Sequence, residues 1–187
     1  MKIKEEKNEQ LMNRVELCYD AAFSDLKKLG INAPKDRISL SINQRAKRRL
    51  GCCKLNRSDI RQKYAIEISL VCSNLNDFEL KNIVMHELIH TLPGCMNHGA
   101  KWKDISRRVN AAYGYNITTT ADYSKIGLDG AVSEPIYNYK VTCESCGQSL
   151  YRIKRSKIVR NPGMYRCSKC GGFLRVERLD GKIYQQR

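Results

Sequence analysis

The chain has 187 residues, 34 of them Lys or Arg and 19 Asp or Glu, which gives a formal net charge of +15 at pH 7. Hydrophobic residues make up 42% of the chain and charged residues 28%, a composition that supports a folded core and excludes wholesale disorder. No apolar run approaches the roughly 18 residues of a membrane span, and the N-terminal residues lack the apolar segment of a secretory signal. We therefore expect no membrane partner and an intracellular location: cytoplasm and nucleoid for a bacterial or phage source, the nucleus for a eukaryotic one.

The basic charge is distributed unevenly. Residues 1–130 carry 22 basic and 15 acidic side chains, a net of +7, whereas residues 131–187 carry 12 and 4, a net of +8. This change, together with the turn residues of 127–135, predicts two domains, residues 1–130 and residues 131–187. Such an excess of positive charge favours a polyanionic partner, nucleic acid first of all, and the alternative is a surface charge that serves solubility alone.

The first part of the chain predicts an α+β domain. Apolar residues recur at helical spacing over residues 11–26, and Gly30 ends this first predicted helix. Apolar and polar residues then alternate over 38–42 and 66–70, which predicts two half-buried strands, with a basic connection at 45–49 between them.

Two further helices are expected before residue 130. Asn76 and Glu79 fit a capping box at the start of one helix, and a Pro-Gly pair at 93–94 ends it. The next helix follows His98, with Trp102 on its apolar side, and ends before Gly114.

Residues 86–90 read His-Glu-Leu-Ile-His within the second predicted helix. Two His residues four positions apart share one helical face, so His86 and His90 can hold one Zn²⁺. The three histidines of the chain fall within 13 residues, and the helix break after His90 allows His98 to return as the third ligand. Asp104 is a less favoured third ligand.

Three protein ligands and one open position are typical of a catalytic zinc site. Glu87 lies beside the metal but is not needed as a ligand, so it is the candidate catalytic base. Zinc lowers the pKa of a bound water from 15.7 to about 7, which makes hydroxide available at neutral pH. The alternative is a chance occurrence of the five-residue motif on an ordinary helix.

Four of the nine cysteines form two Cys-x-x-Cys pairs, Cys143 with Cys146 and Cys167 with Cys170. This spacing is typical of a zinc ribbon, and four thiolates close a structural zinc site that has no open position. A Gly follows each pair, where a tight turn requires positive φ. With short predicted strands at 137–141, 150–153 and 173–176, residues 131–187 are expected to form a small β-rich zinc ribbon. Free thiols or a redox pair are the alternatives.

The ribbon alternates basic and apolar side chains, which favours binding of DNA that is single-stranded or frayed. The expected nucleic-acid contacts are Tyr151, Arg152, Lys154, Arg155, Lys157, Arg160, Arg166 and Lys169. The residues available for base stacking are Tyr137, Tyr139, Tyr165 and Phe173. The alternative is that these rings pack over the zinc and that the charges are merely solvated.

The remaining candidates have smaller roles. Tyr113, Tyr115 and Tyr123 are candidate donors to a developing oxyanion, and Trp102 is expected in the core beneath the zinc. Four other thiols are expected to be buried: Cys18, Cys52, Cys53 and Cys72. Cys95 lies between two expected zinc ligands and is a candidate for tuning the site.

The chain resembles the SprT-like metalloproteases, which include the Spartan proteases. The matching pieces are Arg-Leu-Gly-Cys-Cys at 49–53, the strand at 64–70, the motif at 86–90 and His98-Gly99 followed by Trp102. With the cysteine pairs, the resemblance extends over residues 10–178. It implies a zincin-like minimal metalloprotease domain with helices on a small sheet, zinc ligands His86, His90 and His98, and Glu87 as the base.

Three functional hypotheses follow. The resemblance implies a zinc metalloendopeptidase that is stimulated by DNA and cleaves proteins bound or crosslinked to DNA. The alternative is a zinc-containing nucleic-acid-binding factor without protease activity. A peptidase of free peptides is the third, and the basic ribbon argues against it.

Overall fold

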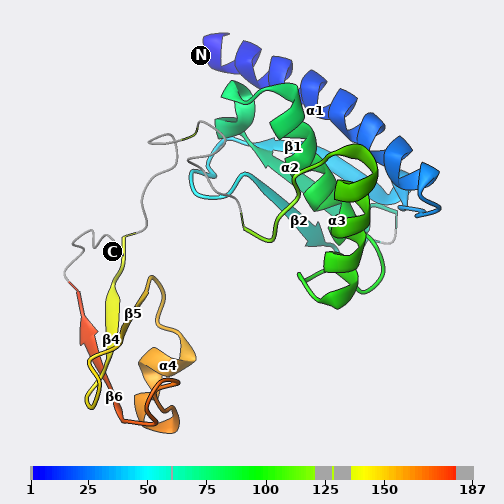
Figure 1. Cartoon of the computed structure of the whole chain (residues 1–187). Helices are drawn as coiled ribbons and strands as arrows, with labels where there is room; N and C mark the ends of the chain where they lie inside the picture. Colours follow the sequence, from blue (N-terminus) through cyan, green and yellow to red (C-terminus); the bar gives the residue numbers. More distant parts are fainter. Residues whose placement is uncertain (1, 60, 121–127, 129–135, 180–187) are drawn as a thin grey trace. The chain divides into compact units, whose positions relative to one another are not determined.

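The computed structural model describes residues 2–59, 61–120, 128 and 136–179. The chain divides into two compact units, Met1–Val132 and Ser133–Arg187 (Figure 1). Among the described residues, no helix has both the length and the apolar character needed to cross a membrane. The stretch where the sequence places the domain boundary lies outside the described residues, apart from the buried Leu128.

The first unit has helices packed on a small mixed sheet, as the α+β prediction requires. Its elements are α1 (Lys2–Lys28), η1 (Lys35–Arg37), β1 (Ile38–Asn43), β2 (Gly51–Leu55), β3 (Tyr64–Ser69), η2 (Leu70–Asn74), α2 (Asp77–His90) and α3 (Ala100–Tyr113). The first helix begins nine residues earlier than its apolar pattern predicts, because a polar N-terminal stretch continues it.

The sheet of the first unit has the strand order β1-β3-β2. β3 pairs in parallel with β1, Ile66 opposite Leu40, and antiparallel with β2, Ile66 opposite Cys53. β2 is therefore an edge strand of the described sheet. It is the one strand of this sheet that the sequence pattern did not predict.

The core lies between the helices and one face of the sheet. α1 and α2 lie side by side (Figure 1) and bury the apolar stripe of each helix, including Val15, Ala22 and Leu80. From the sheet, Ile66 and Ile68 point into this core and are fully buried. Alternation along a strand sends the intervening side chains to the opposite face, which is polar.

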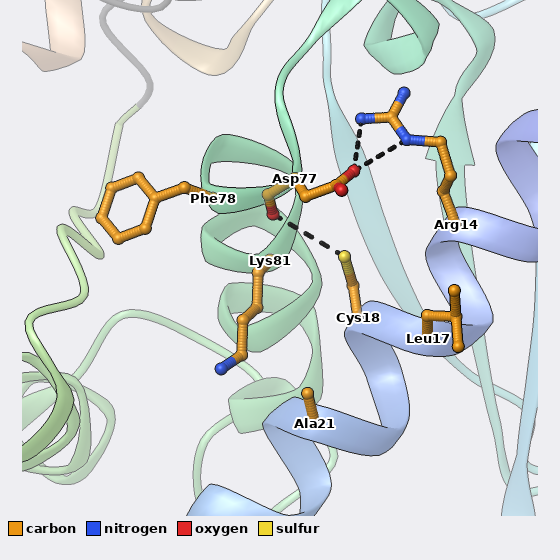
Figure 2. A pocket seen from close by; sticks show the side chains of 7 residues that line it. All are labelled: Arg14, Leu17, Cys18, Ala21, Asp77, Phe78 and Lys81. Carbon is orange, nitrogen blue, oxygen red and sulfur yellow. Dashed lines mark hydrogen bonds and ion pairs between the residues drawn. The ribbon is translucent and has the colours of Figure 1, made fainter.

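Polar contacts join α1 to the start of α2. The Arg14 guanidinium forms an ion pair with Asp77 at 2.7 Å and donates to the carbonyl of Ser73 at 3.1 Å. The Cys18 thiol donates to the backbone carbonyl of Asp77 at 3.7 Å (Figure 2). These contacts hold the N-terminal end of α2, the helix that carries the His-Glu-Leu-Ile-His motif, against α1.

The second unit is a small antiparallel sheet with a short helical segment. Its elements are β4 (Tyr139–Cys143), β5 (Ser149–Arg152), α4 (Lys157–Arg160), η3 (Pro162–Met164) and β6 (Leu174–Arg178). The strand order is β5-β4-β6, with Val141 of β4 opposite Leu150 on one side and Val176 on the other. The three predicted strands are confirmed within two residues at their ends, whereas the helical turn of α4 was not predicted.

Candidate metal centres

Helix α2 presents its two histidines on one face near its C-terminal end. The helix starts at the predicted cap, where the Asn76 side chain accepts a hydrogen bond from the Glu79 amide at 2.8 Å. It ends at His90, and the chain then turns through residues 91–99 before α3 begins. This break brings His98 back to the face that carries His86 and His90.

The three imidazoles converge through their Nε2 atoms. The Nε2–Nε2 distances are 3.3 Å for His86 and His90, 3.2 Å for His90 and His98, and 3.0 Å for His86 and His98. Ligands at about 2.0–2.1 Å from a tetrahedral zinc are separated by about 3.3 Å, so the donor set fits Zn²⁺ closely. The three histidines are thus placed like a zincin active site. Asp104 instead forms an ion pair with Arg107 and is not part of this group.

In His86 and His90 the other ring nitrogen faces a backbone carbonyl, which orients these two rings. His86 Nδ1 lies 3.0 Å from the Thr118 carbonyl oxygen, and His90 Nδ1 lies 2.6 Å from that of Cys95. A ring that donates from Nδ1 keeps the lone pair of Nε2 free for a metal. Cys95 thus contacts the site through its backbone, and burial raises the pKa of its thiol.

Burial keeps the imidazoles neutral. It lowers the pKa of His86 to about 4, with the neighbouring His90 and His98 adding to the effect, and it also lowers the pKa values of His90 and His98. Neutral imidazole is the form that binds a metal. The fully buried Trp102 packs against all three rings, with ring centroids 4.5–5.6 Å apart, as the sequence predicted.

Glu87 is buried against β2. Burial raises the pKa of its carboxyl group to about 7, although a hydrogen bond from the Cys53 backbone amide and the charge of Arg49 act in the opposite direction. A base whose pKa lies near neutrality is well matched to proton transfer at pH 7. The candidate base Glu87 therefore packs against β2, the edge strand that the sequence pattern did not predict.

Gly51 of β2 makes room for this carboxylate. A Cβ atom at position 51 would lie 2.5 Å from Glu87 Oε1 and 2.7 Å from its Cγ, closer than real Cβ atoms come. Because any larger residue would displace Glu87, the glycine is required here for space.

Replacing Gly51 by Ala is expected to lower the rate of any reaction in which Glu87 is the base by about 10²-fold, since a displacement of about 1 Å in a reacting group can cost that much. Zinc content should stay at the wild-type value, because no His side chain is displaced. The matched control is Gly163→Ala, where no atom lies within 4 Å of the added Cβ. Equal activity of both variants would show that Gly51 does not position Glu87.

The four cysteines of the two Cys-x-x-Cys pairs form a second group in the second unit. The Sγ–Sγ distance is 3.5 Å between Cys143 and Cys170 and 3.6 Å between Cys146 and Cys167. Thiolates on a tetrahedral zinc are about 3.8 Å apart, whereas a disulfide requires about 2.05 Å. The arrangement fits a closed zinc site and is inconsistent with disulfides between these partners.

The backbone around this cluster favours the thiolate form of Cys143 and Cys167, whereas at Cys170 a hydrogen bond from the Gly172 amide lowers the pKa but the neighbouring Cys146 and Cys143 raise it, to about 12. Hydrogen bonds from nearby backbone amides, first that of Cys146, lower the pKa of Cys143 to about 6, and those of Lys169 and Cys170 lower that of Cys167. Gly147 and Gly171 both have φ of +73°, which confirms the predicted turns after each pair. Together the His group and the Cys group make two candidate metal sites, consistent with two zinc ions.

The residues predicted to contact nucleic acid all lie in the second unit. Tyr151 and Arg152 are on β5, Lys157 and Arg160 are on α4, and the rest flank these elements or Cys167. The five long basic side chains between residues 152 and 160 are exposed: Arg152, Lys154, Arg155, Lys157 and Arg160.

The aromatic candidates of this unit divide into two kinds. Tyr137 and Tyr151 pack against each other, with ring centroids 5.4 Å apart. Phe173 is 59% exposed and Tyr165 is 37% exposed, and the Arg166 guanidinium lies 4.1 Å from the centre of the Phe173 ring. An exposed ring beside a guanidinium suits base stacking better than the paired tyrosines do.

The candidate oxyanion donors are narrowed by the structure. The hydroxyl of the buried Tyr115 donates to Asp25 at 2.8 Å and is therefore committed to a structural contact. Tyr113 is half-buried beside the core, and Tyr123 lies outside the described residues.

The prediction of buried thiols is confirmed for Cys18 and Cys72, whereas Cys52 and Cys53 are half-buried because they lie on the edge strand.

Comparison with known proteins agrees with this geometry. A model of the SprT-like family matches residues 10–121, more than half of the chain. The matched range contains the three histidines, Glu87 and the sheet, and it ends before the four-cysteine cluster. A search of curated proteins found no match.

Proposed function

The chain belongs to the SprT-like family, and we propose that it is a zinc metalloendopeptidase that cleaves proteins bound or crosslinked to DNA, with stimulation by DNA. The observation that carries this proposal is the convergence of three imidazoles on one point, with the buried Glu87 next to His86 on the same helix. A structural zinc site has no need of a base beside it, so Glu87 favours catalysis over a structural role.

The three histidines and Glu87 of the first unit each have a defined part in the proposed reaction. His86, His90 and His98 would hold zinc, which when bound supplies a Lewis acid that polarises the scissile carbonyl group. Glu87 would take a proton from the attacking water and pass it to the leaving amine. Its burial against β2 keeps bulk water away from the carboxylate and holds it in one orientation.

The edge strand offers a place for the substrate. β2 lies beside Glu87 and is not paired on its outer side within the described residues. An extended peptide can add to such an edge by main-chain hydrogen bonds, which are largely independent of sequence. A protease that must accept many DNA-bound proteins would benefit from recognition of this kind.

The basic ribbon supports the proposed dependence on DNA. Its exposed Arg and Lys side chains would follow phosphates, and the exposed Phe173 and Tyr165 would stack on unpaired bases. In this proposal the ribbon concentrates the enzyme where its protein substrates lie.

The test is cleavage of a purified DNA-binding protein by the zinc-loaded chain, without DNA, with a single-stranded oligonucleotide and with a duplex. The expected result is cleavage only with DNA, and faster with single strands. Binding of DNA without cleavage in any arm would favour the alternative, a nucleic-acid-binding factor without protease activity. Cleavage that is unaffected by DNA would favour a peptidase of free polypeptides.

The exposed basic residues of β5 and the following turn are expected to set the salt dependence of DNA binding. A triple substitution, Arg152→Gln with Lys154→Gln and Arg155→Gln, should make the negative slope of log affinity against log salt concentration shallower by about 2 for single strands. Fluorescence anisotropy of a labelled oligonucleotide at several salt concentrations measures this slope.

A charge-matched triple variant provides the control for this measurement. Lys27, Arg37 and Arg57 are exposed residues of the first unit. Their replacement by Gln removes the same number of positive charges from the chain. Equal slopes for the two variants would show that net charge, and not the ribbon surface, governs binding.

A further inference from the structure

The orientation of His86 depends on a segment that follows α3. The acceptor for its Nδ1 atom is the backbone carbonyl of Thr118, at 3.0 Å. Thr118 itself is exposed at the surface and lies in a stretch without regular secondary structure. The position of this carbonyl therefore depends on the contacts of the residues that precede it in the segment.

Asn110 of α3 holds the two peptide units on either side of the neighbouring Ile117. Its Nδ2 atom donates to the Ile117 carbonyl at 3.0 Å, and its Oδ1 atom accepts from the Ile117 amide at 3.0 Å. One planar amide thus satisfies both polar groups of a residue that is 5% exposed. Because the Ile117 carbonyl belongs to the peptide unit that ends at the Thr118 nitrogen, this double contact fixes where the chain enters Thr118, the residue whose carbonyl oxygen faces His86.

Asn82 of α2 adds a third contact from the helix that carries His86. Its Oδ1 atom accepts from the Asn116 amide at 2.7 Å, and its Nδ2 atom donates to the Phe78 carbonyl one turn earlier at 3.0 Å. Asn82 is buried and lies four residues before His86, so it ties the segment to the helix one turn from the ring. The two asparagines therefore hold the segment from α3 and from α2.

We propose that Asn110, assisted by Asn82, is a positioning residue for the metal ligand His86. It acts through Ile117, by fixing the Thr118 carbonyl that accepts from Nδ1 and so keeps the Nε2 lone pair directed at the metal. Hydrogen-bond partners of ligating histidines raise metal affinity about 10–100-fold. The inference rests on the metal site of the proposed function, but it does not require that the protein be a protease.

The test compares metal affinity at the two sites of one molecule. Asn110→Ala removes both contacts to Ile117. Asn110→Asp keeps the size of the side chain and the acceptor but places a second oxygen against the Ile117 carbonyl. Zn²⁺ affinity is measured on the full chain by competition with a chromophoric chelator, and Co²⁺ absorption distinguishes the His site from the Cys site, whose thiolates give intense charge-transfer bands.

We expect both variants to bind metal more weakly at the His site, by no more than the about 10–100-fold that loss of a direct hydrogen-bond partner costs, and with a changed Co²⁺ d–d spectrum there. Affinity at the four-cysteine site should be unchanged, which makes that site an internal reference. Val109→Ala is the matched control, because it removes buried volume from the adjacent position of α3 and leaves the contacts of Asn110 intact. It should lower the unfolding temperature without changing the affinity or the spectrum of the His site.

Wild-type affinity and spectrum at the His site in Asn110→Asp would overturn the inference, and so would an equal loss of affinity in Val109→Ala. These outcomes are separate from failure of the proposed function. A wild-type protein that fills both sites but cleaves nothing would refute the protease proposal and leave the role of Asn110 intact. If Asn110→Ala does not fold, Asn110→Asp alone decides the question.

Discussion

Replacing Glu87 by Gln is expected to lower the rate of peptide cleavage by about 10²–10⁴-fold while both zinc sites stay filled. Gln has the shape of Glu and retains an oxygen that can accept the Cys53 amide hydrogen bond, so the buried packing against β2 is preserved. It cannot take a proton from water at neutral pH. The measurement is single-turnover cleavage of a DNA-bound protein together with the zinc content of the same sample.

Glu16→Gln is the matched control, because it makes the same chemical change at an exposed position of α1. It should cleave at the wild-type rate. Cleavage by Glu87→Gln at a comparable rate would remove Glu87 from the reaction, and a loss of zinc from that variant would mean that its effect is on the site and not on proton transfer.

The same variant has a second readout in the metal-free protein. The pKa of Glu87 in the folded protein, about 7, is above the ordinary value of 4.5. The folded state therefore retains a proton that the unfolded state loses as the pH rises from 4.5 to 7, and the free energy of unfolding falls across this window. Gln has no such proton, so the stability of metal-free Glu87→Gln relative to wild type should increase between pH 5 and pH 8, as measured by urea denaturation.

Replacing Cys167 by Ser is expected to unfold the second unit and to reduce the zinc content from two ions per chain to one. The described part of this unit buries few apolar side chains besides its thiols, namely Val141, Val159 and Leu179. Structural zinc contributes about 10–16 kcal/mol in zinc-finger peptides, more than so small a core can replace. Metal analysis, together with limited proteolysis across residues 136–179, measures both effects.

Cys52→Ser is the control for this substitution, because it also exchanges a thiol for a hydroxyl but lies on β2, outside the cysteine cluster. It should retain two zinc ions and a protected second unit. If Cys167→Ser kept two zinc ions and the same protection, the cluster would not be a structural metal site. DNA binding should be lost along with the fold of this unit if the ribbon carries it.

The two metal-binding groups could be predicted because their spacing is local. The turn of a helix places residues i and i+4 on one face, and a Cys-x-x-Cys pair needs only a tight turn, so His86, His90 and the cysteine pairs follow from sequence order alone. The position of His98 as the third ligand could also be predicted, because the helix breaks after His90 and the chain has only three histidines. The histidines span 12 positions and each cysteine pair three, whereas the two cysteine pairs lie 21 positions apart and were joined by the typical spacing of a zinc ribbon.

The sheet was predicted less completely. β1 and β3 alternate polar and apolar residues, but β2 reads Gly-Cys-Cys-Lys-Leu, which has no clear alternation. Its strand conformation results from pairing with β3 and not from its own residues, since strand propensity depends strongly on context. The parallel pairing of β1 with β3 likewise depends on contacts between segments distant in sequence, so no local pattern predicts it.

By itself, then, the sequence determined the class of the fold, the two sets of metal-binding residues, the candidate base and the basic character of the ribbon. Only the tertiary structure decided what surrounds them. It set Glu87 against Gly51 and the Cys53 amide, committed the Tyr115 hydroxyl to Asp25, and brought Asn110 to the segment that orients His86. These contacts join residues from different elements, and their geometry follows from how the helices pack on the sheet, which no spacing along the chain specifies.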